Sequence, residues 1–215
     1  MIRRAGWVLL PLVCLSVDAR STRPEALPSA ASLTAAPHAE PVPSDLHASV
    51  AALLKPGGIR AVADDVTLDF WWSGTVPAGS GWSGVPEGTL VGAVRLSGAF
   101  RDIRGSLIKP GTYTLRYGLQ PDNGDHLGVS PHRQFLLISP AADDRSPGAL
   151  GHEGTVDVSK GAVGGSHPAI WSIDPPAAEA APLTIHTTDL GHQAVIVALP
   201  SAMKFGLVLV GKIEA

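Results

Sequence analysis

Short runs of alternating apolar and polar residues, separated by turns rich in glycine and proline, constrain the fold of this chain more than any other sequence feature. Tyr113, Leu115 and Tyr117 show the pattern clearly, because side chains two positions apart point to the same face of a strand. The 215 residues include 24 glycines and 19 prolines, which favour turns and strands over long helices. The sequence therefore predicts an all-β fold, an immunoglobulin-like or related β-sandwich of roughly nine strands.

The segment L-I-K-P-G-T-Y at residues 107–113 resembles the tyrosine corner of immunoglobulin-like and fibronectin type III sandwiches. In that motif a glycine lets the chain turn into a strand, and a tyrosine two residues later donates its hydroxyl to upstream backbone. The resemblance implies a structural role for Tyr113. It supports the sandwich prediction and says nothing of function.

Residues 1–19 are interpreted as an export signal. Arg3 and Arg4 precede an apolar run over residues 5–17, which is shorter than the ~20 residues of a membrane-spanning helix. We therefore expect an exported protein, either periplasmic or secreted. Cys14, the only cysteine of the chain, lies inside this run and fits a lipid-attachment site poorly, because no small residue directly precedes it.

The rest of the chain is expected to form one domain. Residues 20–43 are rich in proline, alanine and serine and lack periodicity, so they are predicted to be a flexible segment. Apolar residues at helical spacing after Ser44 predict one short N-terminal helix. Residues 44–215 are expected to form a single β-sandwich domain with a loop-rich insertion at about 140–168. Asp144, inside this insertion, is interpreted as solvated.

The charge of the chain narrows the classes of partner. Charged residues make up 16% of the chain and the formal net charge is −3, so the sequence has no basic footprint for a nucleic acid. After the signal, no apolar run is long enough for a membrane span. The partners that remain are an unknown small ligand, a glycan or an envelope protein.

The connection at residues 121–133 is the strongest candidate for a functional site. Hairpin loops usually contain about 2–5 residues, and longer ones are often functional. This loop contains four candidate ligand-binding residues, Asp125, His126, His132 and Arg133. We expect Asp125 to pair with Arg133 and His126 to bond to backbone, which would leave His132 exposed to a ligand.

Trp71, Trp72 and Trp82 suggest a surface on which sugar rings could stack. Because adjacent strand residues point to opposite faces, at most one of Trp71 and Trp72 can face a ligand. Trp82 lies in a loop rich in glycine, serine and proline, and it is retained as a candidate ligand-binding residue. The alternative is that all three side chains belong to the core and its cover.

A metal site is the second interpretation of the histidines. His126, His132 and His167 could converge on Zn or Cu, because imidazole suits both metals. No H-E-x-x-H motif or comparable ligand spacing is present, however. The principal prediction includes no cofactor.

Three motifs resemble an uncharacterised family of exported bacterial proteins. They are G-T-Y-T-L-R-Y at 111–117, G-D-H-L-G at 124–128 and R-Q-F-L at 133–136. The family pattern is G-x-Y-x-L-R-Y, then G-D-H-x-G, then R-D-F-L, and no activity is known for it. Gln134 stands where the family has an aspartate, which weakens any essential Arg–Asp pair here. The resemblance implies export and no particular mechanism.

No complete set of catalytic residues is recognisable, and the G-x-S-x-G motif of a hydrolase is absent. The sequence therefore predicts an exported, non-catalytic β-sandwich that serves as a binding or envelope-associated module. The alternative is a metal-dependent enzyme or metal-binding protein with a histidine site on the 121–133 loop.

Overall fold

The computed structural model describes residues 32–79, 81–120, 132–165, 167–176 and 179–211. Residues 31–215 form one compact unit. The expectations for Asp125 and His126 lie outside the described residues, as does the proposed signal. Among the described residues, neither helix has the length and apolar character needed to cross a membrane.

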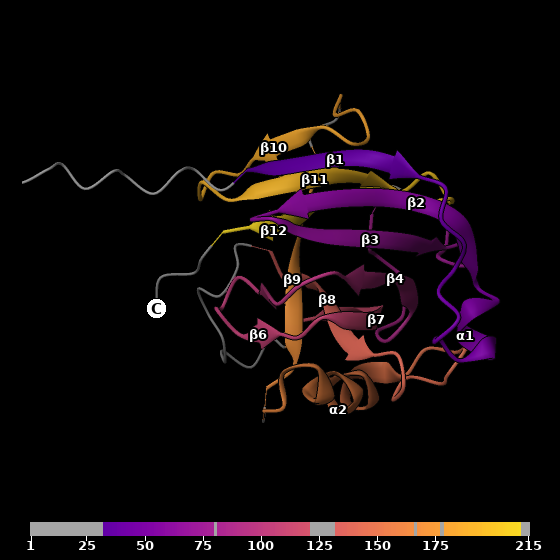
Figure 1. The fold of residues 1–215 in the computed structure, drawn as a ribbon. Coiled ribbons are helices and arrows are strands. Elements are labelled where there is room, and N and C mark those ends of the chain that lie inside the picture. The colour runs from indigo at the N-terminus through magenta and orange to yellow at the C-terminus, as the bar shows by residue number, and fades with distance from the viewer. Residues whose placement is uncertain (1–31, 80, 121–131, 166, 177–178, 212–215) are drawn as a thin grey trace, which may run out of the picture. The chain divides into compact units, whose positions relative to one another are not determined.

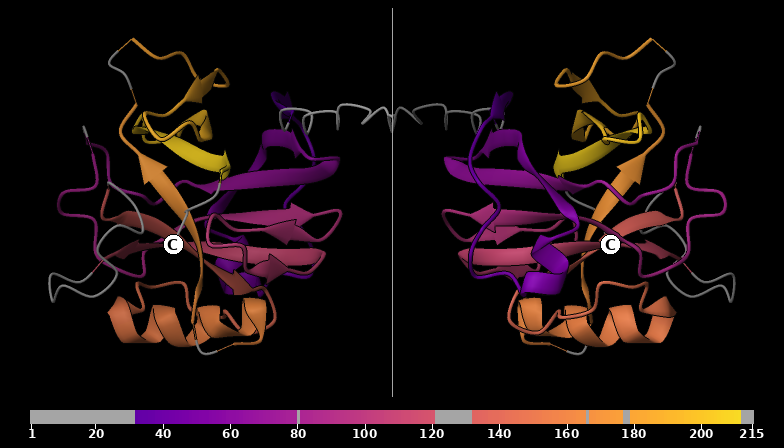
Figure 2. Two further views of the ribbon diagram at one scale, coloured as in Figure 1. Left: turned by 90° about the vertical axis from the view of Figure 1, so that its left-hand side faces the viewer. Right: turned by 90° about the vertical axis from the view of Figure 1, so that its right-hand side faces the viewer.

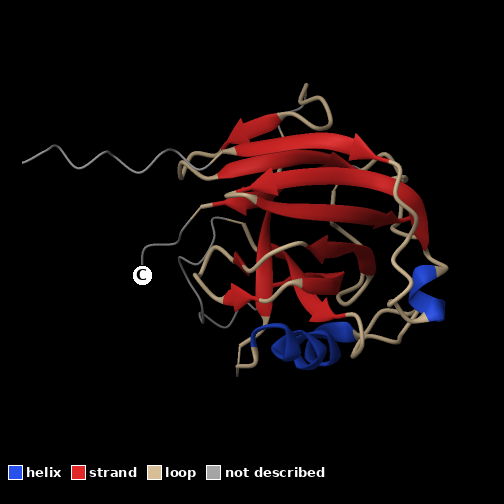
Figure 3. Cartoon of the chain, viewed as in Figure 1, coloured by secondary structure: helices blue, strands red, loops and turns tan. Residues whose placement is uncertain are grey.

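Ten strands form a single sheet in which every neighbouring pair is antiparallel (Figures 1 and 3). Across the sheet the strands are β1 (Leu33–His38), β2 (Leu54–Ala63), β3 (Val66–Ser73), β4 (Leu90–Leu96), β7 (Gly111–Leu119), β8 (Gln134–Pro140), β9 (Ala169–Asp174), β12 (Lys204–Val210), β11 (Gln193–Ala198) and β10 (Ile185–Thr187). The remaining elements are the small hairpin β5 (Phe100–Arg101) and β6 (Leu107–Ile108), the one-turn helix α1 (Ala48–Ala51) and the helix α2 (Gly151–Val163).

The sheet curls round a common core until its two edge strands, β1 and β10, lie beside each other (Figure 1). The inner faces of the strands contribute side chains to one large apolar cluster. The all-β prediction is confirmed. An immunoglobulin-like pair of separate sheets is not confirmed, because the ten strands belong to one continuous hydrogen-bonded sheet.

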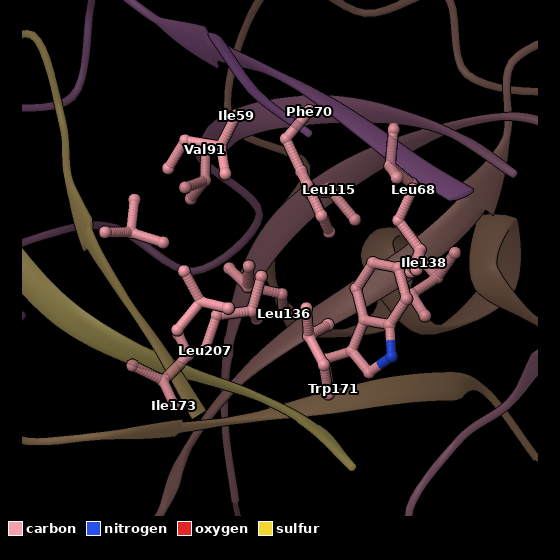
Figure 4. Packing of buried hydrophobic residues seen from close by; sticks show 14 of the residues in the cluster. Ile59, Leu68, Phe70, Val91, Leu115, Leu136, Ile138, Trp171, Ile173 and Leu207 are labelled. Atoms are coloured by element: carbon pink, nitrogen blue, oxygen red, sulfur yellow. The ribbon is translucent and has the colours of Figure 1, made fainter. Parts of the chain in front are cut away.

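Aliphatic and aromatic side chains pack together in this core, Phe70 and Trp171 among them (Figure 4). Phe70 stacks on Trp72 with ring centroids 5.4 Å apart, and Trp171 contacts Phe70 at 5.6 Å. Each buried aromatic removes a large apolar area from water, so these rings contribute strongly to stability. Trp71 and Trp72 lie on opposite faces as expected. Both are buried. Trp72 lies in the main core, and Trp71 is covered on the outer face by α1 and its flanking residues.

The local turn motif is confirmed, although the sandwich it was taken to support is not. The Tyr113 hydroxyl donates a hydrogen bond to the carbonyl of Lys109 at 2.8 Å. The same ring is buried in the main core. The bond pins the turn before β7 to the strand itself, so Tyr113 is structural.

One expectation about the N-terminal part is wrong, and the predicted short helix is present but shorter than expected. Residues 33–38, expected to be flexible, form β1 and pair with β2 along their whole length. The strand is selected by tertiary structure, because it pairs with the polar backbone of β2 and buries Leu33. The predicted helix is shortened to one turn, since the chain from Leu54 onward is recruited into β2.

The segment at 140–168 contains a helix that the sequence did not predict. The buried residues of α2 are small, Thr155, Ser159 and Ala162, and two valines, Val156 and Val163, pack beside them in partly buried positions. Ser159 donates its hydroxyl to the carbonyls of Ile138 and Ala169 at 2.8 and 3.1 Å. Close approach to the sheet and hydrogen bonds therefore help to hold this helix. Its sequence shows no strong apolar periodicity from which a helix could be predicted.

Candidate functional site

A cavity of about 340 Å³ lies between α2 and the outer face of β7, β8 and β9. In both views of Figure 2, α2 is the orange helix that lies below the magenta and pink strands of the sheet. We call this cavity the α2 pocket. It is lined by Glu87, Arg104, Tyr117, Gly118, Leu119, Gln120, Phe135, Leu137, His152, Thr155, Val156, Lys160, His167, Pro168 and Ile170.

The floor of the α2 pocket is apolar. Phe135 and Leu137 of β8 pack with Ile170 of β9 and Val156 of α2. β8 can supply this floor because it is apolar on both faces, and its other face lies in the main core. The sequence F-L-L-I at residues 135–138 has this character, which is typical of a strand covered on both sides.

A glycine in β7 makes room for the floor. A Cβ atom on Gly118 would lie 2.1 Å from Cδ1 of Leu137. Any larger residue at this position would displace Leu137 into the cavity. The bare backbone at Gly118 therefore contributes to the shape of the α2 pocket.

The rim of the α2 pocket carries the charged side chains. Glu87 is the one carboxylate among the described lining residues, and both of its oxygens have partners. Its Oε1 accepts the backbone N–H of Leu119 at 2.8 Å, and its Oε2 lies 3.3 Å from Nδ1 of His152. The ammonium of Lys160 donates to Asp157 at 2.8 Å across an exposed part of α2.

Arg104 reaches the rim from the turn between β5 and β6. Its Nη2 donates to the carbonyl of Pro168 and lies 3.7 Å from Oδ2 of Asp102. Its Nε is buried without a hydrogen-bond partner. The guanidinium makes no other hydrogen bond to a described residue, so the described part of the chain leaves most of its donor capacity unused.

Arg116 of β7 lies on the face of the sheet that α2 covers. Every N–H group of its guanidinium has an acceptor in the protein. Its Nε and Nη2 donate to the two carboxylate oxygens of Asp144 at 2.7 and 2.8 Å. Its remaining N–H groups donate to the carbonyls of Gly88, Gly148 and Ser146 at 2.5, 2.9 and 2.5 Å.

This network corrects the expectation that Asp144 is solvated. Its side chain is fully buried against Arg116, and the hydroxyl of Thr114 donates to it at 2.5 Å. The arginine of the L-R-Y motif therefore holds the chain that leads into α2.

The structure describes the two ends of the predicted site loop. Arg133 donates from Nε and Nη2 to the carbonyl of Gln120 at 3.1 and 2.6 Å, and Gln120 donates its N–H back to the Arg133 carbonyl at 2.8 Å. Arg133 thus ties the ends of the loop together from an exposed position. The predicted pairs with Asp125 and His126 lie outside the described residues.

His132 is half-buried at the start of β8, beside the end of β9. Burial raises the pKa of Asp174, and the nearby charge of His132 opposes that shift. His132 does not line the α2 pocket.

Trp82 closes one end of the main core. Its indole stacks on Tyr117 with ring centroids 4.8 Å apart, and it meets Phe205 edge-on at 5.3 Å. One face of the ring is therefore already covered by Tyr117. Trp82 does not line the α2 pocket.

The three histidines of the metal hypothesis are placed differently. His167 lines the α2 pocket, His132 lies outside it, and His126 is not among the described residues. Within the described part of the chain, no group of three or more histidine, cysteine, aspartate or glutamate residues is arranged to hold a metal ion. The metal hypothesis therefore stays a prediction.

The α2 pocket lies next to the expected site, since Gln120 and Phe135 flank the 121–133 loop and line the pocket. Sequence reasoning missed Arg104, Val156 and Lys160, which come from the β5–β6 turn and from α2. No motif marks them, because their spacing exists only in the folded chain. Searches of protein-family models, of curated proteins and of solved structures find no match to this chain.

Proposed function

We propose that this protein is an exported, non-catalytic binding module that takes a small, largely apolar molecule into the α2 pocket. The export part of the proposal rests on the N-terminal signal features. The fold is a curled antiparallel sheet that we relate to β-sandwiches through its tyrosine corner. The ligand part rests on the α2 pocket, which also lies at the base of the loop singled out in the sequence.

The cavity itself is the observation that carries the proposal. Its volume of about 340 Å³ is at the lower end of the range for small-molecule sites, which is about 300–1,000 Å³. An apolar floor of Phe135, Leu137 and Ile170 contributes binding free energy by burying apolar ligand surface. A charged rim over such a floor is the usual construction of a ligand site.

The proposal is tested by titration with N-phenylnaphthylamine, an uncharged dye whose fluorescence rises in apolar surroundings. We expect saturable binding to the wild-type protein. The variant Val156→Trp should lose this binding, because the indole would occupy the cavity from α2. The matched control is Val158→Trp, two residues along the same helix, which does not line the α2 pocket.

Two outcomes would contradict the proposal. The first is a wild-type protein that shows no saturable fluorescence change while its melting transition is cooperative. The second is equal binding by Val156→Trp and Val158→Trp, which would place the dye elsewhere.

A further inference from the structure

We propose that the ligand of the α2 pocket carries a carboxylate or similar anionic group, and that Arg104 binds it at the rim. This inference rests on the proposed function, because it names the chemical class of the molecule in that pocket. The supporting observations are the charged groups at the rim, the hydrogen bonds of Arg104 and the apolar floor of the pocket.

The unused hydrogen-bond donors at the rim favour an anion over a cation. The described lining residues include two permanent cations, Arg104 and Lys160, and one carboxylate, Glu87; Asp102 and Asp157 lie 3.7 and 2.8 Å from the two cations but do not line the pocket. Both oxygens of Glu87 are already engaged, one by the N–H of Leu119 and the other by His152. A cationic ligand would have to displace one of these partners, whereas an anionic ligand would meet unpaired N–H groups.

Arg104 is the group that can bind the anion. The two N–H groups at Nη1 make no hydrogen bond to a described residue. Nη2 donates to the Pro168 carbonyl and lies 3.7 Å from Oδ2 of Asp102. The side chain of Arg104 is 21% exposed, so an anion bound there would be partly shielded from water. A guanidinium binds carboxylates through two parallel hydrogen bonds, which are stronger than bonds between neutral groups.

Lys160 contributes less than Arg104. Its side chain is 42% exposed and its ammonium already donates to Asp157. Exposed charges are screened by water and salt, so their contribution to binding is small. The anion is therefore expected at the Arg104 side of the rim, with the apolar body of the ligand over Phe135 and Ile170.

The test uses three probes that share one alkyl chain and differ in the head group: octanoate, octanol and octylammonium. Each competes with N-phenylnaphthylamine at neutral pH. We expect octanoate to bind about tenfold or more tightly than octanol, and octylammonium to bind most weakly. Equal affinities for octanoate and octanol would overturn the inference and leave the proposed function intact. Failure of the dye to bind would instead count against the proposed function.

Substitutions assign the effect to one residue. Arg104→Gln should remove the preference for octanoate over octanol, which lowers the affinity for octanoate about tenfold or more. The matched control is Arg101→Gln, which removes the same charge from the same hairpin but does not line the α2 pocket. Lys160→Gln should reduce octanoate binding by a smaller factor. If Arg104→Gln fails to fold, the comparison of head groups in the wild-type protein still decides the question. An unchanged octanoate preference in a folded Arg104→Gln variant would contradict the assignment.

Discussion

Arg116 and Arg104 lie on the α2 side of the same sheet, and they differ in how much of their hydrogen-bonding capacity the protein uses. Arg116 is fully buried, and its donors are taken by Asp144 and by three backbone carbonyls. Arg104 makes one bond to Pro168 and lines a cavity. A buried arginine that the protein satisfies serves structure. An arginine with unused donors beside an apolar cavity can serve a ligand.

The largest loss of stability is expected when Arg116, whose donors are all taken, is replaced. Arg116→Met should lower the free energy of unfolding by about 3–5 kcal/mol, because the buried carboxylate of Asp144 would lose its cationic partner. Urea titration measures this loss, with the exposed Arg101→Met as the control. A loss below about 1 kcal/mol would show that Arg116 is not the structural anchor described here.

A pair of glycine substitutions compares the packing of the two regions. Gly88→Ala should cost about 1–3 kcal/mol, because Gly88 has φ +80° and a Cβ there would lie 2.5 Å from the backbone nitrogen of Leu150. Gly118→Ala should cost about 0.5–1.5 kcal/mol, because the displaced Leu137 can turn into the α2 pocket. Thermal melting of both variants tests the order. A reversed order would mean that the pocket side is packed as tightly as the Arg116 side.

A third arginine–carboxylate site, Asp69 with the half-exposed Arg60 and Arg95, makes the contribution of such a pair to stability measurable as a function of pH. Burial raises the pKa of Asp69, but hydrogen bonds from Arg60 and Arg95 outweigh burial and hold that pKa below its ordinary value of 3.8. A depressed folded-state pKa stabilises the protein above about pH 4, and this stabilisation is lost as the pH falls further. Asp69→Asn should therefore cost about 1 kcal/mol at neutral pH and progressively less below pH 4. Urea titrations across that range would contradict this if the difference between variant and wild type did not shrink.

The smallest effect on stability is expected at Arg104, which uses few of its hydrogen-bond donors. Arg104→Met should change the free energy of unfolding by less than about 1 kcal/mol, because the protein loses one hydrogen bond to Pro168 and one ion pair with Asp102 at 3.7 Å, without a hydrogen bond between the two charges. The same urea titration used for Arg116→Met makes the two values directly comparable. Equal losses at the two positions would remove the distinction between the structural arginine and the ligand-binding one.

The sequence determined the features of this fold that depend on neighbouring residues. The alternation of Tyr113, Leu115 and Tyr117 predicted a strand where β7 is found. The turn L-I-K-P-G-T-Y predicted the hydrogen bond from Tyr113 to Lys109. Period-two patterns and turn chemistry are local, so they can be read without knowing which strands pair.

The tertiary structure decided which segments are recruited and where a cavity remains. β1 is a strand because β2 offers it a backbone to pair with, and α2 is a helix because its small residues fit against β8 and β9. Arg104 and Pro168 meet across 64 positions of sequence, and Arg116 and Asp144 across 28. Long-range pairing is governed by the register of the whole sheet rather than by any one segment. The sequence therefore predicted strands and a structural tyrosine. Only the folded chain shows that the donors of Arg116 are all taken, whereas Arg104 keeps donors that a ligand could use.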